Sequence, residues 1–378
     1  MGRLRDARRD RGWSVPQLIA ALRPCAARLG VALPSDQSLK TEISRHENGH
    51  VTPMGDWRRL YRAVYGRSDE ELGLTPGSDG PVMPQSGELG TYLLASRRVD
   101  RPLVETMRQQ IDHVRLLDRR VGAPSLIEQT RAQMNTLHEL LTYSLKPSVR
   151  EGLASVLADA STLAGWQALD VGSVGAAWQH YELAKTAARE SRSVALLAHA
   201  MGEQAYALLD LHRPRDGVTL IGEAQRIAPR TPALLRTWLH AAEAELHAAT
   251  SLVRPGTDHT SACRRALDKA EKMLPDGRPD TGLPFLALDA AHFARWRGHC
   301  LARLGDSAAI DDLYRALNGM DPSFTRAEAG LRCDLAQALA IRGDLEEARK
   351  QRQHAQQLAN QVGSLRHRKR IARMHLAA

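Results

Sequence analysis

The feature that most constrains the fold is a repeated unit: an Ala-rich helix, a short turn with Gly or Asp, and a second Ala-rich helix. From about Lys146 onward the turns recur roughly every 40 to 50 residues, a period typical of helical-repeat proteins. Each repeat buries its apolar face only against its neighbours, so several must stack. No strand pattern interrupts them. We predict an α-solenoid of about five helix pairs, with turns at 169–173, 211–217, 252–258, 304–309 and 342–348.

The composition supports this expectation. Hydrophobic residues make up 43% of the chain and aromatic residues only 4%, while Ala and Leu are frequent, as in mainly helical proteins. Ahead of the repeats, 103–122 is predicted as an amphipathic helix whose apolar stripe is Leu103, Met107, Ile111, Val114 and Leu117. Small residues recur where two helices would approach closely: Ala160, Ala164, Gly165, Ala198, Gly202, Ala290 and Ala294.

Composition also divides the chain into regions. Residues 1–74 are rich in Arg, and residues 75–87, TPGSDGPVMPQSG, are predicted as a linker. Residues 88–145 are predicted as a helical connector and candidate dimerisation region, and 146–378 as the repeats. The chain closes with the basic segment RHRKRIARM at 366–374, which we interpret as a solvated capping helix.

The cysteines and the hydropathy pattern indicate the compartment. Cys25, Cys263, Cys300 and Cys333 are scattered and form no C-x-x-C pair, a reduced pattern without a disulfide or zinc framework. No apolar stretch follows the N-terminal arginines, and no run of about 18 apolar residues occurs. We expect a cytoplasmic protein that does not enter a membrane.

The stretch HENGH at 46–50 has two incompatible interpretations. It matches H-E-x-x-H, in which two histidines on one helix bind zinc and the glutamate is the general base. Here Gly49 interrupts the helical turn and Pro53 ends any helix soon after, although a third ligand from Glu70 or Glu71 is compatible with the spacing. We therefore expect no metal site and keep a zinc hydrolase as a remote alternative.

The second interpretation is the end of a DNA-reading helix. Ser14 is an expected N-cap, with Pro16 in the first turn of the helix that follows it. Residues 1–67 hold 13 Lys and Arg against 6 Asp and Glu, an excess of 7 within a net charge of +9, which favours a polyanionic partner. In SLKTEISRHENG, a buried stripe of Leu39, Ile43 and His46 would leave the opposite side to Lys40, Thr41, Ser44 and Arg45.

These motifs support a resemblance to a known family. The pattern S-R-x-E-N-G-x-x-x-P, after a W-S-x-x-x-L helix, resembles the Xre/Cro-type, phage-repressor-like helix-turn-helix family over about residues 4–72. The chain departs from that pattern at PCAARLGVALPSDQ, residues 24–37, which lengthens the connection before the second helix. As a whole, the chain resembles actinobacterial transcriptional regulators that fuse such a domain to tetratricopeptide-like repeats.

The resemblance implies an all-α fold in which the second helix of the motif docks in the major groove. Matched residue by residue, Lys40, Thr41 and Arg45 are the expected base readers, because Lys and Arg suit guanine and a Thr methyl group suits thymine. Asn48 and His50, at the helix end, suit phosphates. One such helix reads too few base pairs for a genome, so we expect a homodimer.

The repeats of such regulators resemble a sensor with a concave groove. Relatives that sense peptides hold them with ladders of Asn, and this chain has only Asn48, Asn135, Asn318 and Asn360. That scarcity favours an apolar ligand or a protein partner. Aromatic side chains on the first helices of the pairs are the candidate effector site, unless they only fill the core: Trp166, Tyr206, Trp238 and Trp296.

We therefore predict a sequence-specific, DNA-binding transcriptional regulator controlled by a small-molecule or peptide effector. The alternative is a scaffold whose N-terminal domain docks protein rather than DNA. The sequence has no P-loop, no G-x-S-x-G motif and no clustered carboxylates, so we expect neither an enzyme nor a cofactor.

Overall fold

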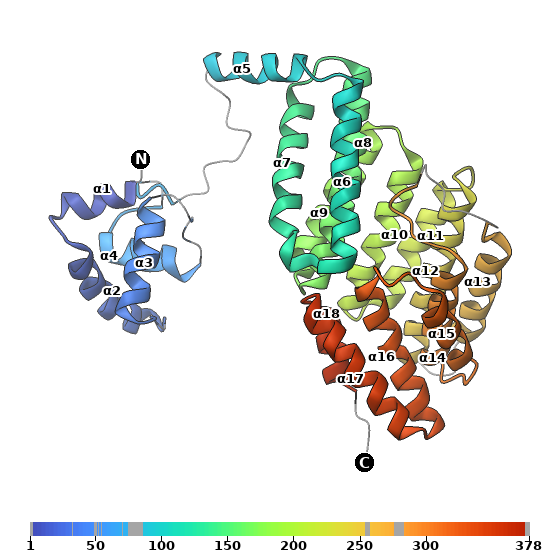
Figure 1. Ribbon diagram of the computed structural model, residues 1–378. Coiled ribbons are helices and arrows are strands. Elements are labelled where there is room, and N and C mark those ends of the chain that lie inside the picture. Colours follow the sequence, from blue (N-terminus) through green and yellow to red (C-terminus); the bar gives the residue numbers. More distant parts are fainter. Residues whose placement is uncertain are drawn as a thin grey trace. The chain divides into compact units, whose positions relative to one another are not determined.

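The computed structural model describes residues 3–31, 33–48, 51, 53, 55–69, 71–74, 86–253, 258–275 and 283–374. Within these ranges all regular secondary structure is helical, as predicted (Figure 1). The chain divides into two compact units, Met1–Leu89 (unit 1) and Gly90–Ala378 (unit 2). The four cysteines are buried and free. No helix of the described residues is long and apolar enough to cross a membrane.

Unit 1 packs its helices around one small apolar core that includes Leu18, Leu39 and Leu60. Ser14 caps the second helix through a capping box with Gln17, as the sequence indicated. This cap satisfies backbone N–H groups that would otherwise lack a partner at the start of the helix. The helices of unit 1 are α1 (Arg3–Asp10), α2 (Val15–Leu29), α3 (Asp36–Glu47) and α4 (Asp56–Tyr65).

The extra residues at 24–37 do not simply lengthen a loop. α2 continues through Pro24 to Leu29 and ends at Gly30, which adopts the left-handed conformation that a C-cap requires. Cys25 and Ala26 are buried, so packing against the core holds the added turn in place despite the proline. The N-cap of α3 is Ser35, about one turn before Ser38, where the SLKTEISRHENG motif begins.

Unit 2 contains the predicted five helix pairs, and the described parts of their turns fall where the sequence placed them. Two helices, α6 and α7, pack against the first pair and belong to the same unit. The pairs are α8 (Pro147–Asp170) with α9 (Val174–Glu190), α10 (Val194–Asp210) with α11 (Pro214–Ile227), α12 (Ala233–Val253) with α13 (His259–Met273), α14 (Ala290–Arg303) with α15 (Ala309–Gly319), and α16 (Thr325–Arg342) with α17 (Leu345–Gln361). The remaining helices are α5 (Ser86–Arg97), α6 (Arg101–Val121), η1 (Ala123–Ser125), α7 (Ile127–Tyr143) and α18 (Leu365–Ala372).

Two of the predicted small residues allow neighbouring helices to touch. A Cβ atom on Gly165 would lie 2.5 Å from the ring of Tyr181, and one on Gly202 would lie 2.4 Å from the ring of Trp238. Both rings are buried, so neither can move aside without disturbing the core. The close helix packing of the repeats therefore depends on these glycines.

The stripe expected on α6 is wrong at its ends. Leu103 and Leu117 are 37% and 47% exposed, whereas Arg115 and Asp118 are buried. The buried face of α6 is therefore rotated by about one residue from the predicted stripe. Arg115 and Asp118 can be buried because each has a charged partner inside unit 2.

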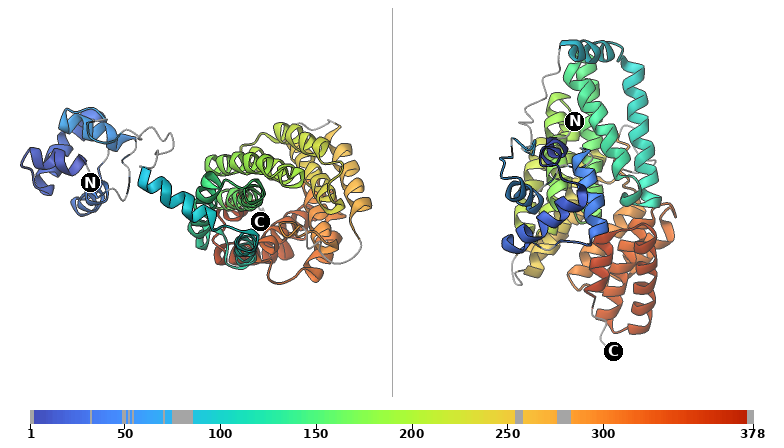
Figure 2. Two further views of the ribbon diagram at one scale, coloured as in Figure 1. Left: turned by 90° about the horizontal axis from the view of Figure 1, so that it is seen from above. Right: turned by 90° about the vertical axis from the view of Figure 1, so that its left-hand side faces the viewer.

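The last helices return to the beginning of unit 2. α18 contacts α8 and α16, and α16 contacts α6. Seen from above, the pairs follow a curve that brings the red C-terminal helices beside the green α8 region (Figure 2). The junction is tight, because a Cβ atom on Gly122 would lie 1.9 Å from the carbonyl oxygen of Val362. The expectation of a solvated capping helix at 366–374 is therefore wrong: Arg366 and Arg370 of α18 line the interior of unit 2.

Candidate functional site

The surface of α3 carries the first candidate site. Leu39 and Ile43 are fully buried and fix which side of the helix faces the core. The expected base readers Lys40, Thr41 and Arg45 are all exposed on the remaining surface. Their side chains form no ion pair with a described residue, and Thr41 donates only to the carbonyl oxygen of Gln37, at 3.2 Å. All three are therefore free to meet a partner from outside.

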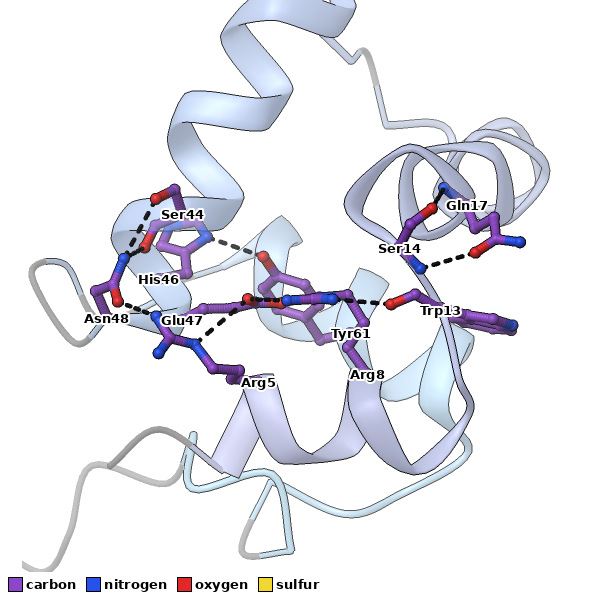
Figure 3. Close-up of polar contacts among 10 residues, drawn as sticks. All are labelled: Arg5, Arg8, Trp13, Ser14, Gln17, Ser44, His46, Glu47, Asn48 and Tyr61. Atoms are coloured by element: carbon purple, nitrogen blue, oxygen red, sulfur yellow. Dashed lines mark hydrogen bonds and ion pairs between the residues drawn. The ribbon is translucent and has the colours of Figure 1, made fainter.

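The end of α3 is anchored by Glu47. The Nε of Arg8 donates to one carboxylate oxygen of Glu47 at 2.6 Å, and its Nη2 donates to the other at 2.8 Å (Figure 3). The remaining Nη1 of Arg8 donates to the carbonyl oxygen of Trp13 at 2.8 Å. The hydrogen bond and charge of Glu47 raise the pKa of Arg8. One buried carboxylate thus ties α3 to α1 and to the start of α2.

His46 belongs to the core rather than to a surface site. Its ring is buried, and its Nδ1 lies 3.0 Å from the hydroxyl of Tyr61 (Figure 3). The ring also packs edge-on against Trp57. Burial lowers the pKa of His46, so the neutral ring is favoured. Among the described residues, no three His, Cys, Asp or Glu side chains come together as a metal site.

Of the two expected phosphate contacts, Asn48 lies within the described residues and His50 does not. Asn48 is exposed and ends α3: its Nδ2 donates to the carbonyl oxygen of Ser44 at 2.7 Å, and its Oδ1 accepts from Arg5 (Figure 3). Its side chain therefore already holds the helix end, and a phosphate contact remains a prediction. His50, like Gly49, lies outside the described residues.

The acidic side chains of unit 1 are largely committed to its other arginines. Ion pairs join Arg23 to Asp36, Arg59 to Asp56, Arg67 to Asp10, and both Arg58 and Arg62 to Asp69. Lys40 and Arg45 keep their charge without such a partner. The uncompensated positive charge of the described part therefore includes the exposed face of α3.

The second candidate site is a cavity of about 1110 Å³ inside unit 2. Its walls come mainly from the first helix of each pair together with α6 and α18, so the basic C-terminal segment forms part of its lining. The volume is slightly above the range that small-molecule pockets usually have. All four aromatic residues singled out from the sequence line this one cavity: Trp166, Tyr206, Trp238 and Trp296.

These four rings have different surroundings. Trp238 and Trp296 meet edge-to-face with their centroids 6.1 Å apart, and both are at most 9% exposed. Tyr206 and Trp296 donate to the same carboxylate oxygen of Glu245, at 3.2 and 2.9 Å. Trp166 instead lies under the guanidinium of Arg366, 5.4 Å from the ring centroid. Part of each ring is core and part is cavity wall.

Charged pairs cross the cavity and close the curve of helices. Arg326 on α16 bonds to Asp118 on α6 and, at 3.3 Å, to Asp170 at the end of α8. Arg366 on α18 donates to Asp210 at 3.0 Å. These hydrogen bonds are directional, so they fix how α16 and α18 are aligned against α6, α8 and α10 more specifically than apolar contacts would.

His299 also joins charged groups from different helices of the cavity wall. Its Nδ1 lies 2.7 Å from Asp334, which also accepts from Arg370, and its Nε2 lies 3.1 Å from Glu245. Burial raises the pKa of Glu245, but the interactions with His299, Arg303 and Arg366 together outweigh burial, so the pKa falls below its usual range. Glu245 and Asp334 are therefore compensated carboxylates.

Glu203 is the exception among the cavity carboxylates. Its nearest partner is the Nε2 of His199, at 3.6 Å, and its Oε2 is buried with no hydrogen-bond partner. Burial raises the pKa of Glu203 to about 7 and lowers that of His199 to about 3. At neutral pH this pair therefore carries little of the charge of the cavity.

Sequence reasoning missed this polar interior. Carboxylates that are far apart in the chain meet only in the folded cavity, so no cluster was visible. A usable signal was present: one or two charges interrupt otherwise apolar, Ala-rich stretches, as Glu203 does in LLAHAMGEQAYALL and as Glu243 and Glu245 do in AAEAELHAA. A lone charge in such a stretch either finds a partner from another helix, as Glu245 does, or loses its charge through burial, as Glu203 largely does.

The chain was also compared with known proteins. No protein-family model matches it, and no curated protein is similar enough to match. Among solved structures it is similar to a Rap protein complexed with competence and sporulation factor, at 14% identity and a TM-score of 0.44, over 92% of this chain and 98% of the other. That likeness is too distant to carry an argument about what this chain binds. Its own helices define it as an all-α protein with helical repeats.

Proposed function

We propose that the protein is a sequence-specific DNA-binding regulator of transcription, without catalytic activity, whose repeats bind an effector. The observation that carries the DNA-binding part is the two-sided character of α3. One side is fixed in the core by Leu39 and Ile43, and the other exposes Lys40, Thr41 and Arg45 without carboxylate partners. A helix of this kind, anchored at its end by Glu47, suits insertion into the major groove.

The test starts from fragments of genomic DNA that the full-length protein retains, which are sequenced to obtain a preferred duplex. Arg45→Ala is expected to weaken binding to that duplex by roughly 1–3 kcal/mol and to relax the preference at one base pair. Arg349→Ala, an exposed arginine of α17, is the matched control and should bind as the wild type does. Equal binding of Arg45→Ala and wild type would refute the proposed role of α3.

The alternative is a scaffold whose unit 1 docks protein. Salt separates the two functions, because phosphate contacts release counterions and DNA affinity then falls steeply as salt rises. Titrating the retained duplex at several salt concentrations should give a linear loss of log affinity with log salt. Absence of any salt-dependent retention of duplex DNA would favour the scaffold.

We also propose that the regulator is a homodimer, because one α3 helix reads only a few base pairs. Support comes from α6, whose exposed large aliphatic side chains include Leu103, Leu116, Leu117 and Val121. These lie in the region that the sequence marked for dimerisation. Light scattering of the 41.6 kDa chain should give twice that mass for the free protein, and twice that mass plus the mass of one duplex on DNA. A monomer in both conditions would contradict the dimer.

The effector site in this proposal is the cavity of unit 2. Its support is the volume of about 1110 Å³, the aromatic walls and the polar groups that converge from several helices. The same helices close the curve of unit 2 through Arg326 and Arg366, so a molecule bound inside contacts both ends of the repeat array. Binding there can select one curvature of the repeats.

A further inference from the structure

The charges of the cavity do not balance. Nine Arg and Lys side chains line it, against six Asp and Glu. Five of the six carboxylates are bonded to Arg or His: Asp118, Asp159, Asp210, Glu245 and Asp334. The sixth, Glu203, has its pKa raised to about 7 by burial and contributes at most part of a negative charge. The cavity is therefore strongly positive.

The excess lies on five cations that pair with no carboxylate of the described residues. They come from three elements that face the cavity: Arg119 on α6, Arg295 and Arg303 on α14, and Lys369 and Arg373 at the end of the chain's last helix. Two of these five cations contact aromatic rings instead of carboxylates. Arg119 lies 4.6 Å from the ring centroid of Phe324, and Arg295 lies 5.6 Å from that of Trp296.

Arg119, Arg295 and Arg303 are only partly exposed, so each loses part of its hydration and gains no anion in return, whereas Lys369 and Arg373 stay exposed to solvent. The Nε of Arg295 is buried and has no hydrogen-bond partner. Arg303 acts electrostatically on Glu245, whose two oxygens are already taken by His299, Trp296 and Tyr206. The protein's own acids therefore leave these cations available to a ligand.

The apolar part of the wall defines the rest of the ligand. Flat rings alternate with the cations, and large aliphatic side chains of the lining remain more than half exposed: Leu252 at 57%, Val253 at 66% and Ile341 at 60%. Aromatic and aliphatic groups at these positions gain free energy when a planar or hydrocarbon body covers them. A purely inorganic anion would leave that surface in water.

We infer that the cavity binds a small anionic molecule that joins a carboxylate or phosphate group to a planar apolar body. This inference rests on the effector-binding part of the proposed function and names the ligand class; it is independent of DNA binding. It also revises the apolar ligand expected from the scarcity of Asn, because the positive interior was not visible in the sequence.

The experiment uses two fluorescent probes of nearly the same shape and different charge, with the full-length protein and no DNA. These are the anionic 1-anilinonaphthalene-8-sulfonate and the neutral N-phenyl-1-naphthylamine. The sulfonate should bind at least about 10-fold more tightly at low salt and lose that advantage as salt rises. Competition by 1-naphthoate and by 1-naphthyl phosphate, with neutral 1-naphthol as reference, then distinguishes a carboxylate from a phosphate ligand.

Variants assign the binding to the cavity. Arg303→Gln and Arg119→Gln should each weaken sulfonate binding by about 3- to 10-fold and leave the neutral probe unchanged. Arg349→Gln on α17, outside the cavity, is the matched control. Circular dichroism verifies that each variant is folded, and each cation is tested separately so that one misfolded variant leaves the other informative.

Equal binding of both probes, or sulfonate binding that neither cavity variant weakens, would overturn the anionic ligand while leaving an effector site in place. Failure of both probes to bind would overturn the inference together with the effector-binding part of the proposed function. Retention of duplex DNA is measured separately, so its loss bears on α3 and not on the cavity.

Discussion

At the scale of single residues, the partners of Glu47 bear on the two interpretations of HENGH. A general base must keep a carboxylate oxygen free for water, whereas both oxygens of Glu47 accept from Arg8. The side chain is 5% exposed and holds two helices together. The residue therefore acts as an anchor, which explains why a protease-like string occurs at the end of a short helix.

This role predicts the effect of Glu47→Gln. Replacing the carboxylate leaves Arg8 without its charged partner and should destabilise unit 1 by about 2 kcal/mol. Amides of α1 and α3 should then exchange roughly 30-fold faster. Hydrogen exchange of the full-length chain measures it, with Glu42→Gln on the same helix as control. Unchanged exchange, or a loss of α3 protection when a chelator is added to the wild type, would contradict the anchor.

Glu203 gives a prediction with a defined pH dependence. Burial raises the pKa of its carboxyl group from 4.5 to about 7, so the folded state binds this proton more tightly than the unfolded state. Its contribution to stability is full below pH 4.5 and is lost as the pH rises through about 7. Gln cannot ionise, so Glu203→Gln should exceed the stability of the wild type by only about 1 kcal/mol at pH 5 and by up to about 3 kcal/mol at pH 8.

Urea unfolding at the two pH values tests this expectation. Glu223→Gln, on the exposed side of α11, is the control, because its carboxylate is half-exposed and paired with Arg226. The difference between Glu203→Gln and wild type must grow with pH. A difference of the same size at pH 5 and pH 8 would mean that Glu203 stays ionised in the folded protein.

At the scale of elements, the sequence predicts what depends on local pattern. The helix pairs, their turns, the cap at Ser14 and the buried stripe of α3 follow from periodicity and end signals. The four aromatic residues of the cavity could also be identified from the sequence, because they recur on the first helices of the pairs. These properties require only neighbours in the chain.

The errors share one physical cause, which is contact between distant segments. The basic segment of α18 has the composition of a solvated face, yet Arg366 is drawn inward by Asp210, 156 residues earlier. α6 turns Arg115 and Asp118 inward for the same reason, and Leu103 becomes exposed. A pattern of apolar residues cannot show that a charge has a distant partner.

The closure of unit 2 predicts the outcome of Gly122→Ala. The added methyl group would collide with the backbone of Val362, so the junction between η1 and the end of α17 must separate. We expect amides of α18 to exchange at least about 10-fold faster and the sulfonate probe to bind more weakly. Hydrogen exchange and fluorescence titration of the full chain measure the two effects.

Gly305→Ala is the control for the effect of a side chain at a positive φ. Gly305 has a φ of 73°, close to the 82° of Gly122, but a Cβ atom there would meet nothing within 4 Å. Gly305→Ala therefore places a side chain at a similar positive φ without the collision. Equal effects of both substitutions on α18 would show that the junction does not hold the array closed.

At the scale of the whole molecule, the proposal requires that the two units communicate. Thermodynamic linkage makes that requirement strict, because a ligand that changes the DNA affinity by some factor must have its own affinity changed by DNA by the same factor. The cavity is bounded by both ends of the repeat array, so a bound anion selects among curvatures of unit 2. Coupling of about 1–3 kcal/mol would appear as a 5- to 150-fold change.

The last prediction is that reciprocity. With the preferred duplex in hand, saturating 1-anilinonaphthalene-8-sulfonate should change the Kd of the full-length protein for DNA, and saturating duplex should change the Kd for the probe by an equal factor. Arg303→Gln should move the effect to higher probe concentration without changing that factor, because it weakens the ligand and not the coupling. Arg45→Ala should weaken the duplex and likewise preserve the factor. If both affinities are independent of the other partner, the repeats and α3 act separately and the regulator is not controlled through this cavity.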